Sequence, residues 1–281
     1  MIRRMIKSGV PGLDKVLGGG FLEGSITALS GPTGSGRSTL AVQFLYNGTM
    51  QYNEPGLYIS IEESKNDFFF HMSGYTWDLA NAEKERKLIF LDYPIYEVDQ
   101  ILEQYGAIQE IINSTGVKRV VVDSIMPIAL FFPSEDERKK GFLKLIDNIR
   151  KWNATTLIIA EDTNSSQIGN LPHTAYNVES FTDGWINMPY SYDPKKGDRT
   201  RFVEVIKMKG VMHSTKLYPA VISDNGFTIL SGSEKSEEKI NQSAVKKVIQ
   251  EATAPTRTVL KPAKNLNDAK KKLGSNRFMK K

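Results

Sequence analysis

The stretch SITALSGPTGSGRSTLAVQFLYNG, residues 25–48, decides the fold of this chain. A short apolar run leads into a glycine-rich loop at 31–36, and the loop opens into a longer segment with helical spacing. The glycines let backbone amides face phosphate oxygens without a Cβ in the way, and the start of a helix adds free N–H groups. The stretch therefore predicts a phosphate-binding loop between a strand and a helix.

The residues that follow the loop set its chemistry. Arg37 stands where the phosphate-loop pattern has lysine, and Ser38 falls where a hydroxyl ligates magnesium. The alternative is a glycine-rich turn that binds nothing, but strand, loop, helix and serine occur here in the required register. We expect the nucleotide phosphates to be bound by Gly31, Pro32, Thr33, Gly34, Ser35, Gly36, Arg37, Ser38 and Thr39.

Two other apolar runs end in carboxylates that suit a nucleotide site. In KRVVVDS, Asp123 comes at the carboxyl end of a buried strand, where it can hold magnesium through the water shell of the ion. In LYISIEES, Glu62 and Glu63 end a strand at the same sheet edge and can orient or deprotonate an attacking water. The alternatives are a turn cap and a pair of solvated acids. With the loop nearby, Ser38 and Asp123 are the expected magnesium ligands, and Glu62 and Glu63 the expected catalytic residues.

Short β-rich runs alternate with longer segments of helical period along the chain. This order predicts an α/β fold in which a mostly parallel sheet is flanked by helices. Strands are expected at 25–30, 57–62, 88–92, 118–123 and 155–161, and helices at 37–52, 64–74, 97–115 and 135–153. After Phe181, the runs GWINMP, RFVEVIKMK and KLYPAVI alternate with turn-like segments, which predicts antiparallel strands that extend the sheet at one edge.

The composition excludes several classes of protein. The 281 residues include 40% hydrophobic residues, which is enough for a sizeable core, and no cysteine, which excludes a disulfide scaffold and a thiolate zinc site. The three histidines do not cluster in the sequence and do not suggest a metal site. The N-terminus has no apolar signal region, and Asp123 and Pro127 interrupt the most apolar run. We therefore expect a cytoplasmic protein without a transmembrane segment.

Positive charge is concentrated at the C-terminus. The chain has 37 Lys and Arg against 32 Asp and Glu, but residues 231–281 hold 13 against 5, which leaves a net charge of −3 for the first 230 residues. We expect one domain at 1–230 and a basic tail at 231–281 without a packed core, apart from one helix at about 234–252. The tail either docks on an acidic surface or is simply solvated.

These motifs resemble the KaiC/RadA branch of the RecA-like ATPases, and more closely the single-domain KaiC-like proteins common in archaea. The segment SGVPGLDKVLGGGFLEGSITALSGPTGSG is similar to the opening of that family, YISIEES to its paired-glutamate strand, and VVVDSI to its Walker B strand. SFTDGWI and VIKMKGVMHS are similar to its later motifs, so the resemblance covers about residues 6–230. It implies a RecA-like P-loop core, ATP and Mg²⁺, and ring homo-oligomers, often hexamers, with ATP between neighbouring subunits.

The resemblance also gives a role to two lysines. Lys207 and Lys209 fall on the Lys-x-Arg pair of the family, which implies that they reach across to the γ-phosphate of the ATP bound by the adjacent subunit. Cationic groups in that position stabilise the charge that develops during phosphoryl transfer.

Three positions depart from the family pattern. Arg37 replaces the loop lysine, Lys209 replaces the finger arginine, and Ala160 stands where relatives carry a hydroxyl. A guanidinium is longer, planar and forked, while lysine cannot make a bidentate contact with phosphate. We hypothesise that nucleotide binding survives these changes and that hydrolysis is slow.

Three functions are consistent with this pattern. The first is an oligomeric ATP hydrolase of low activity that acts as a nucleotide-dependent switch for an unidentified protein partner. The second is a scaffold that assembles on ATP with negligible hydrolysis. The third is a recombinase paralogue that binds single-stranded DNA. Such proteins need cationic loops near the ring axis, whereas residues 163–180 contain no lysine or arginine, so nucleic-acid binding is not favoured.

Overall fold

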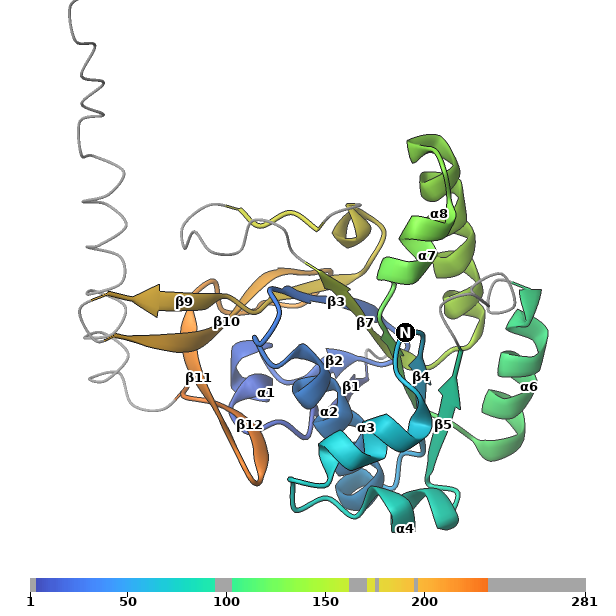
Figure 1. Cartoon of the computed structure of the whole chain (residues 1–281), viewed down its shortest axis with the longest axis horizontal. Helices are drawn as coiled ribbons and strands as arrows, with labels where there is room; N and C mark the ends of the chain where they lie inside the picture. Colours follow the sequence, from blue (N-terminus) through green and yellow to red (C-terminus); the bar gives the residue numbers. More distant parts are fainter. Residues whose placement is uncertain (1–3, 94–102, 162–170, 175–176, 195–196, 232–281) are drawn as a thin grey trace, which may run out of the picture.

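The computed structural model describes residues 4–93, 103–161, 171–174, 177–194 and 197–231. Within them a ten-stranded sheet forms the centre of the molecule, in the order β12-β11-β10-β8-β3-β7-β6-β4-β5 with β9 paired to β10 (Figure 1). The parallel part consists of β3 (Ile26–Gly31), β4 (Gly56–Ser60), β5 (Leu88–Asp92), β6 (Arg119–Asp123) and β7 (Thr155–Glu161). These are the five strands expected from the apolar runs, so the predicted α/β fold is confirmed.

The other half of the sheet is formed by β8 (Gly184–Asn187), β9 (Tyr190–Asp193), β10 (Asp198–Met208), β11 (Tyr218–Ser223) and β12 (Gly226–Ile229). Strands β10 and β11 pair antiparallel, as predicted, and β9 and β12 also pair antiparallel with their neighbours. The prediction is wrong for one side of β8, which pairs parallel with β3 and antiparallel only with β10. The physical reason is that the chain enters β8 at the end of the sheet where β3 begins, so that Thr27 faces Gly184.

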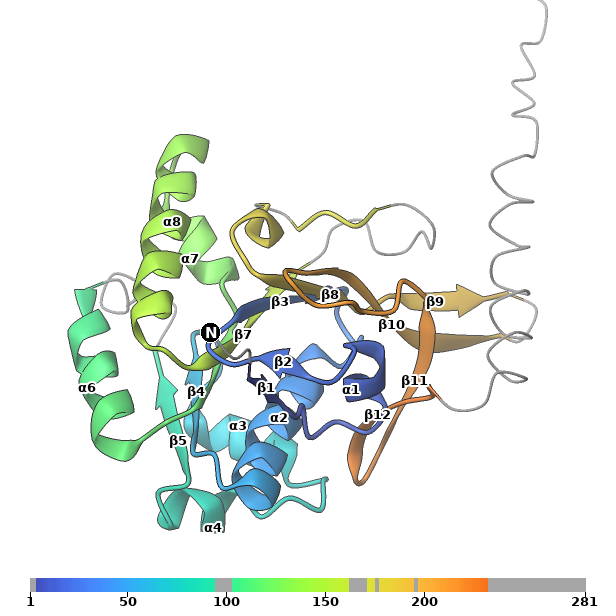
Figure 2. The same ribbon diagram turned by 180° about the vertical axis from the view of Figure 1, so that it is seen from behind.

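Helices cover both faces of the sheet and enclose two hydrophobic cores. One core lies under α2 (Arg37–Tyr52), α3 (Lys65–Met72) and α4 (Leu79–Lys84), and the other under α6 (Tyr105–Thr115), α7 (Met126–Phe131) and α8 (Glu135–Lys151). Figures 1 and 2 show the two helix groups from opposite sides. Because side chains alternate along a strand, Val121 belongs to the first core while Val120 and Val122 belong to the second.

The longer elements agree best with the sequence prediction. Helix α2 and strands β5 and β7 have the expected bounds, and α3 and α8 differ from them by a few residues. Helix α6 begins at Tyr105 rather than at residue 97, and residues 97–102 of that prediction lie outside the described part of the chain. The sequence pattern did not indicate α4, α7, β9 or β12, nor the short β1 (Met5–Ile6), α1 (Leu13–Val16), β2 (Phe21–Leu22) and η2 (Val178–Ser180).

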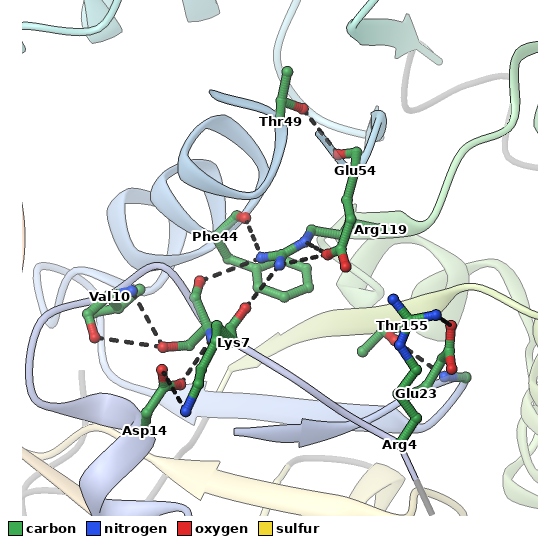
Figure 3. A network of polar contacts seen from close by, with 12 residues as sticks. Arg4, Lys7, Val10, Asp14, Glu23, Phe44, Thr49, Glu54, Arg119 and Thr155 are labelled. Atoms are coloured by element: carbon green, nitrogen blue, oxygen red, sulfur yellow. Dashed lines mark hydrogen bonds and ion pairs between the residues drawn. The ribbon is translucent and has the colours of Figure 1, made fainter. Parts of the chain in front are cut away.

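A buried arginine joins the N-terminal segment to the sheet (Figure 3). Arg119, the first residue of β6, has no exposed surface and donates hydrogen bonds to the Glu54 carboxylate at 2.7 Å and to the carbonyls of Phe44 and Lys7 at 2.9 and 2.7 Å. Its guanidinium also lies 4.6 Å from the centre of the Phe44 ring. Burial lowers the pKa of Arg119, and Glu54 opposes that shift. The network fixes α2 against the start of the strand that ends in Asp123.

Two sequence predictions concern the ends of the molecule. The predicted domain boundary at 230/231 remains a prediction, because residues 232–281, with the expected helix at 234–252, lie outside the described residues. In the described part of the chain, no helix is both long enough and apolar enough to span a membrane.

Candidate nucleotide site

The glycine-rich loop connects β3 to α2 at the carboxyl edge of the sheet. Gly36, the N-cap residue of α2, has a φ of 95°, and a Cβ there would lie 2.8 Å from Ile222 and 2.9 Å from Phe227. Only glycine therefore fits this position. The first turn of α2 has neither a capping side chain nor an acidic residue, so its free N–H groups and its positive dipole end are not neutralised locally. This end of α2 suits a phosphate group.

The two predicted magnesium ligands lie together. Asp123 ends β6, and the hydroxyl of Ser38 in the first turn of α2 is among the groups that act on the pKa of its carboxyl. Tyr58 of β4 also donates a hydrogen bond to Asp123, with 2.5 Å between Oη and Oδ2. Burial raises the pKa of Asp123, while the bonds from Tyr58 and Ser38 and the charge of Arg37 oppose that shift.

Tyr58 was not indicated by the sequence pattern. It is buried, and burial followed by the charge of Asp123 raises the pKa of its hydroxyl well above 10.0, so it stays a donor. Its position in a buried apolar strand was the only available signal, and that signal also fits a plain core residue.

The two predicted catalytic glutamates face different partners. Glu62 accepts a hydrogen bond of 2.8 Å from the hydroxyl of Ser124, the residue after Asp123, and its charge contributes to the raised pKa of Asp123. Glu63 contacts Nδ1 of His71 in the last turn of α3, and its backbone is hydrogen-bonded to the side chain of Ser60. Glu62 is thus held beside the buried carboxylate, whereas Glu63 is paired with an exposed histidine.

The guanidinium of Arg37 crosses the carboxyl edge of the sheet. Its Nη1 donates a hydrogen bond of 2.6 Å to the carbonyl of Ala160 near the end of β7, the strand beside β3. The side chain is therefore tied to a neighbouring strand at the level of the loop.

Lys207 and Lys209 lie at the opposite edge of the sheet. They belong to the end of β10 and the residue just beyond it, where Met208 pairs with Gly184 and Gly184 pairs with Thr27 near the amino end of β3. The loop follows the other end of β3, a strand of six residues, which corresponds to about 20 Å. The structure therefore does not bring these lysines to the loop of their own chain.

A second feature that the sequence pattern did not indicate is a hairpin beside the loop. Arg201 of β10 donates a hydrogen bond of 3.0 Å from Nε to the carbonyl of Gly34, and its guanidinium lies 4.7 Å from the centre of the Tyr190 ring. Arg199 lies over Tyr190 and Tyr192. The alternation of tyrosines in YSYD was the signal for β9, but the adjacent turn residues masked it.

Comparison with known proteins places the chain in a family. A family model described as ATPase: KaiC matches residues 6–234. The chain belongs to the KaiC family of ATPases. A KaiC-like protein from Pyrococcus horikoshii has a crystal structure that matches with a TM-score of 0.70 and 34% identity, over 81% of this chain and 99% of that one. This match confirms the predicted KaiC-like fold.

Curated relatives include whole-length and partial matches. A UPF0273 protein of Methanocaldococcus jannaschii is 28% identical over 240 residues, which are 80% of this chain and 96% of that protein. The circadian clock oscillator protein KaiC of Parathermosynechococcus lividus is 29% identical over 231 residues, 79% of this chain but only 42% of the clock protein. The chain thus corresponds to less than half of the clock KaiC, and the activities of that whole protein do not transfer with the match.

Within the KaiC-family chain, the predicted site residues lie at two edges of the sheet. The loop, Ser38, Asp123 and Glu62 meet at the carboxyl edge, and Lys207 and Lys209 lie at the amino edge. The roles of all these residues toward a nucleotide remain predictions. Serine and aspartate oxygens are ligands that Mg²⁺ prefers, which fits the expected ion. No cluster of three or more His, Cys, Asp or Glu side chains able to hold a metal occurs among the described residues. Magnesium would therefore depend on phosphate oxygens and water for its remaining ligands.

Proposed function

We propose that this KaiC-family protein binds ATP with Mg²⁺, hydrolyses it slowly, and acts as an oligomeric switch for a protein partner. The observation that supports this most directly is the meeting of the loop, the Ser38–Asp123 pair and Glu62 at one edge of the sheet. That edge is where open α/β sheets bind their ligands.

Each group has a chemical task in hydrolysis. The amides of residues 31–36 and the N-terminus of α2 bind the phosphates, and Ser38 with Asp123 would hold the magnesium ion, which neutralises charge on the phosphate oxygens. Glu62, oriented by Ser124, accepts a hydrogen bond from the attacking water and aligns it with the γ-phosphate. Glu63 is the second carboxylate near this water, with His71 as its own partner.

Slow hydrolysis follows from the position of Arg37. Its guanidinium is bonded to the Ala160 carbonyl, so part of its donor capacity is directed at the protein rather than at the phosphates. It keeps a positive charge near the phosphates and therefore supports binding. A displacement of about 1 Å from the optimal position lowers a catalytic rate by about a hundredfold.

The location of the two lysines supports assembly. Because Lys207 and Lys209 lie at the amino edge, they can contact a nucleotide phosphate only on another chain whose carboxyl edge faces them. Such a head-to-tail contact uses two different surfaces of the same protein, and it closes into a ring when the rotation between subunits permits.

A scaffold that binds ATP without significant hydrolysis is the second candidate. The Arg37–Ala160 contact favours it, because the contact directs part of the donor capacity of Arg37 away from the phosphates, while the charge that supports binding stays near them.

One experiment separates the two functions. Steady-state ATP hydrolysis with magnesium is measured beside direct nucleotide binding for the wild type, Arg37→Lys and Glu62→Gln/Glu63→Gln. For a slow switch we expect wild-type turnover well below about 1 per second, faster turnover for Arg37→Lys, and none for the glutamate variant. Wild-type turnover at or above about 1 per second contradicts slow hydrolysis. If all three proteins bind ATP and are equally inert, the scaffold explains the data better. If the wild type does not bind ATP, both functions are wrong.

A further inference from the structure

Both amino-edge lysines are held by one short segment of their own chain. Lys207 donates hydrogen bonds from Nζ to the carbonyls of Glu179 and Thr182, at 3.0 and 2.8 Å. Lys209 lies 3.3 Å from Oδ1 of Asp183, the next residue of that segment. Residues 179–183 therefore form a cradle for the two ammonium groups.

Asp183 is itself firmly fixed. Arg150, at the end of α8, pairs with both of its carboxylate oxygens at 3.1 Å, and the backbone N–H of Ile26 donates a hydrogen bond of 3.1 Å to Oδ2. The Asp183 backbone N–H is also bonded to the Ile26 carbonyl at 2.7 Å. Burial alone would raise the pKa of Asp183, but the hydrogen bonds from Arg150 and Ile26 outweigh it and lower the pKa.

The charges around the cradle are unequal. Three cations, Lys207, Lys209 and Arg150, surround two acids, of which Asp183 is paired with Arg150 and Lys209, and Glu179 is buried and bonded to the hydroxyl of Thr174. Burial and then the charge of Lys209 lower the pKa of Lys207, as expected for neighbouring cations. Asp183 has Arg150 as a bidentate partner and holds Lys209 through a single contact, so the other N–H groups of the Lys209 ammonium can donate to an external anion while Asp183 still holds it.

We propose that Asp183, fixed by Arg150, is a positioning residue that directs Lys209 toward the γ-phosphate of the nucleotide on a neighbouring subunit. This inference rests on the proposed function. It adds the residue that orients Lys209 toward the nucleotide of a neighbouring subunit. Lysine needs such a group because its ammonium is a point charge on a flexible stem, unlike a guanidinium. The side chain of Lys209 is 54% exposed and would otherwise sample many rotamers, whereas that of Asp183 is only 19% exposed.

A double-mutant cycle tests the proposal. The full chain is compared as wild type, Asp183→Asn, Lys209→Ala and the double variant. Asparagine keeps an acceptor for the Ile26 amide but removes the charge. Asp224→Asn, in an exposed turn where the Asp224 backbone carbonyl accepts a hydrogen bond from the Thr76 N–H, is the matched control. The measurements are ATP turnover, the ATP dependence of assembly by sedimentation, and binding of a fluorescent ATP analogue to the loop.

We expect Asp183→Asn to lower turnover, or the extent of ATP-dependent assembly, by about tenfold or more. The double variant should match Lys209→Ala within about twofold, because a positioning residue has no effect once the group it positions is gone. Affinity of the isolated subunit for the analogue should stay unchanged, since the loop lies at the other edge of the sheet. Asp224→Asn should behave as wild type in all three measurements.

Two results overturn the inference alone. One is an unaltered Asp183→Asn protein, and the other is a double variant whose loss equals the product of the two single losses, which indicates a merely structural role. A wild type that neither hydrolyses ATP nor assembles with it overturns the proposed function and this inference together. If Asp183→Asn does not fold, Asp183→Glu takes its place in the cycle, because it keeps the charge and shifts it by one methylene group.

Discussion

Replacing Arg119 by methionine tests the buried network that fixes the N-terminal segment. The change removes the cation that pairs with Glu54 in Figure 3, and the Glu54 side chain is just 16% exposed while that of Arg119 is fully buried. Breaking a buried ion pair by removing one partner costs about 3–5 kcal/mol. The carbonyl of Lys7 also loses the guanidinium donor, which costs about 1–3 kcal/mol if it stays buried, while the carbonyl of Phe44, which lies inside α2, loses only an additional donor.

The cost of the unpaired Glu54 carboxylate and the cost at the carbonyls are not additive. If the structure around the substituted side chain relaxes and water reaches Glu54, the same water also hydrates the carbonyls. We therefore expect a loss of about 4–6 kcal/mol in the free energy of unfolding, out of a total of about 5–15 kcal/mol for a typical domain. Urea unfolding followed by circular dichroism measures this loss. The matched control is Arg4→Met, which breaks the Arg4–Glu23 pair, whose side chains are 68% and 43% exposed. That variant should change the free energy by no more than about 1 kcal/mol.

The double variant Arg119→Met/Glu54→Leu sharpens the test. It removes both charges, so it should be more stable than Arg119→Met alone, although it has lost one more native side chain. An Arg119→Met protein that is as stable as Arg4→Met, or a double variant that is less stable than the single one, refutes the reasoning.

Three further outcomes follow from the structure. Gly36→Ala should lower nucleotide affinity at least tenfold in a binding titration, because a Cβ there clashes with Ile222 and Phe227 in a conformation that L-residues rarely adopt. Tyr58→Phe removes the 2.5 Å bond to Asp123 and should weaken the dependence of turnover on magnesium, seen as a higher half-saturating concentration. Because the pKa of Asp183 is lowered, its stabilisation is present above its ordinary value of 3.8 and is lost as the pH falls through the folded-state pKa. Urea midpoints should therefore converge for wild type and Asp183→Asn as the pH falls below about 4.

The sequence was a good guide where a residue type follows from backbone geometry. The loop glycines, the strand before them and helix α2 could be predicted because a phosphate loop needs that order of conformations, and the structure has them at nearly the expected bounds. The position of Asp123 and Glu62 at the carboxyl edge could be predicted for a related reason, because parallel strands bring their carboxyl ends to one edge of the sheet. The pairing of β8 with β3 was missed because a strand of four residues carries no signal of direction.

Contacts between side chains could not be predicted in the same way. Tyr58, Ser124 and His71 acquire their roles from neighbours that are distant in sequence or on another element, and each residue type fits an ordinary structural position equally well. Arg150 is one of several charged residues on α8. It could not be distinguished from the others because its partner, Asp183, is 33 residues further along the chain and reaches the end of α8 only in the folded protein.

The division of the site between two sheet edges has a consequence for kinetics. One chain carries the proposed phosphate-binding and water-orienting groups at the carboxyl edge, while the ammonium groups of Lys207 and Lys209 lie about 20 Å away at the amino edge. If the proposed trans contact operates, stabilisation of the transition-state charge is a property of a pair of chains and not of one. Turnover per chain should then rise with protein concentration and level off when assembly is complete, and Lys209→Ala should remove most of that rise. Turnover per chain that is independent of concentration down to the fully dissociated protein would mean that each subunit completes its own site.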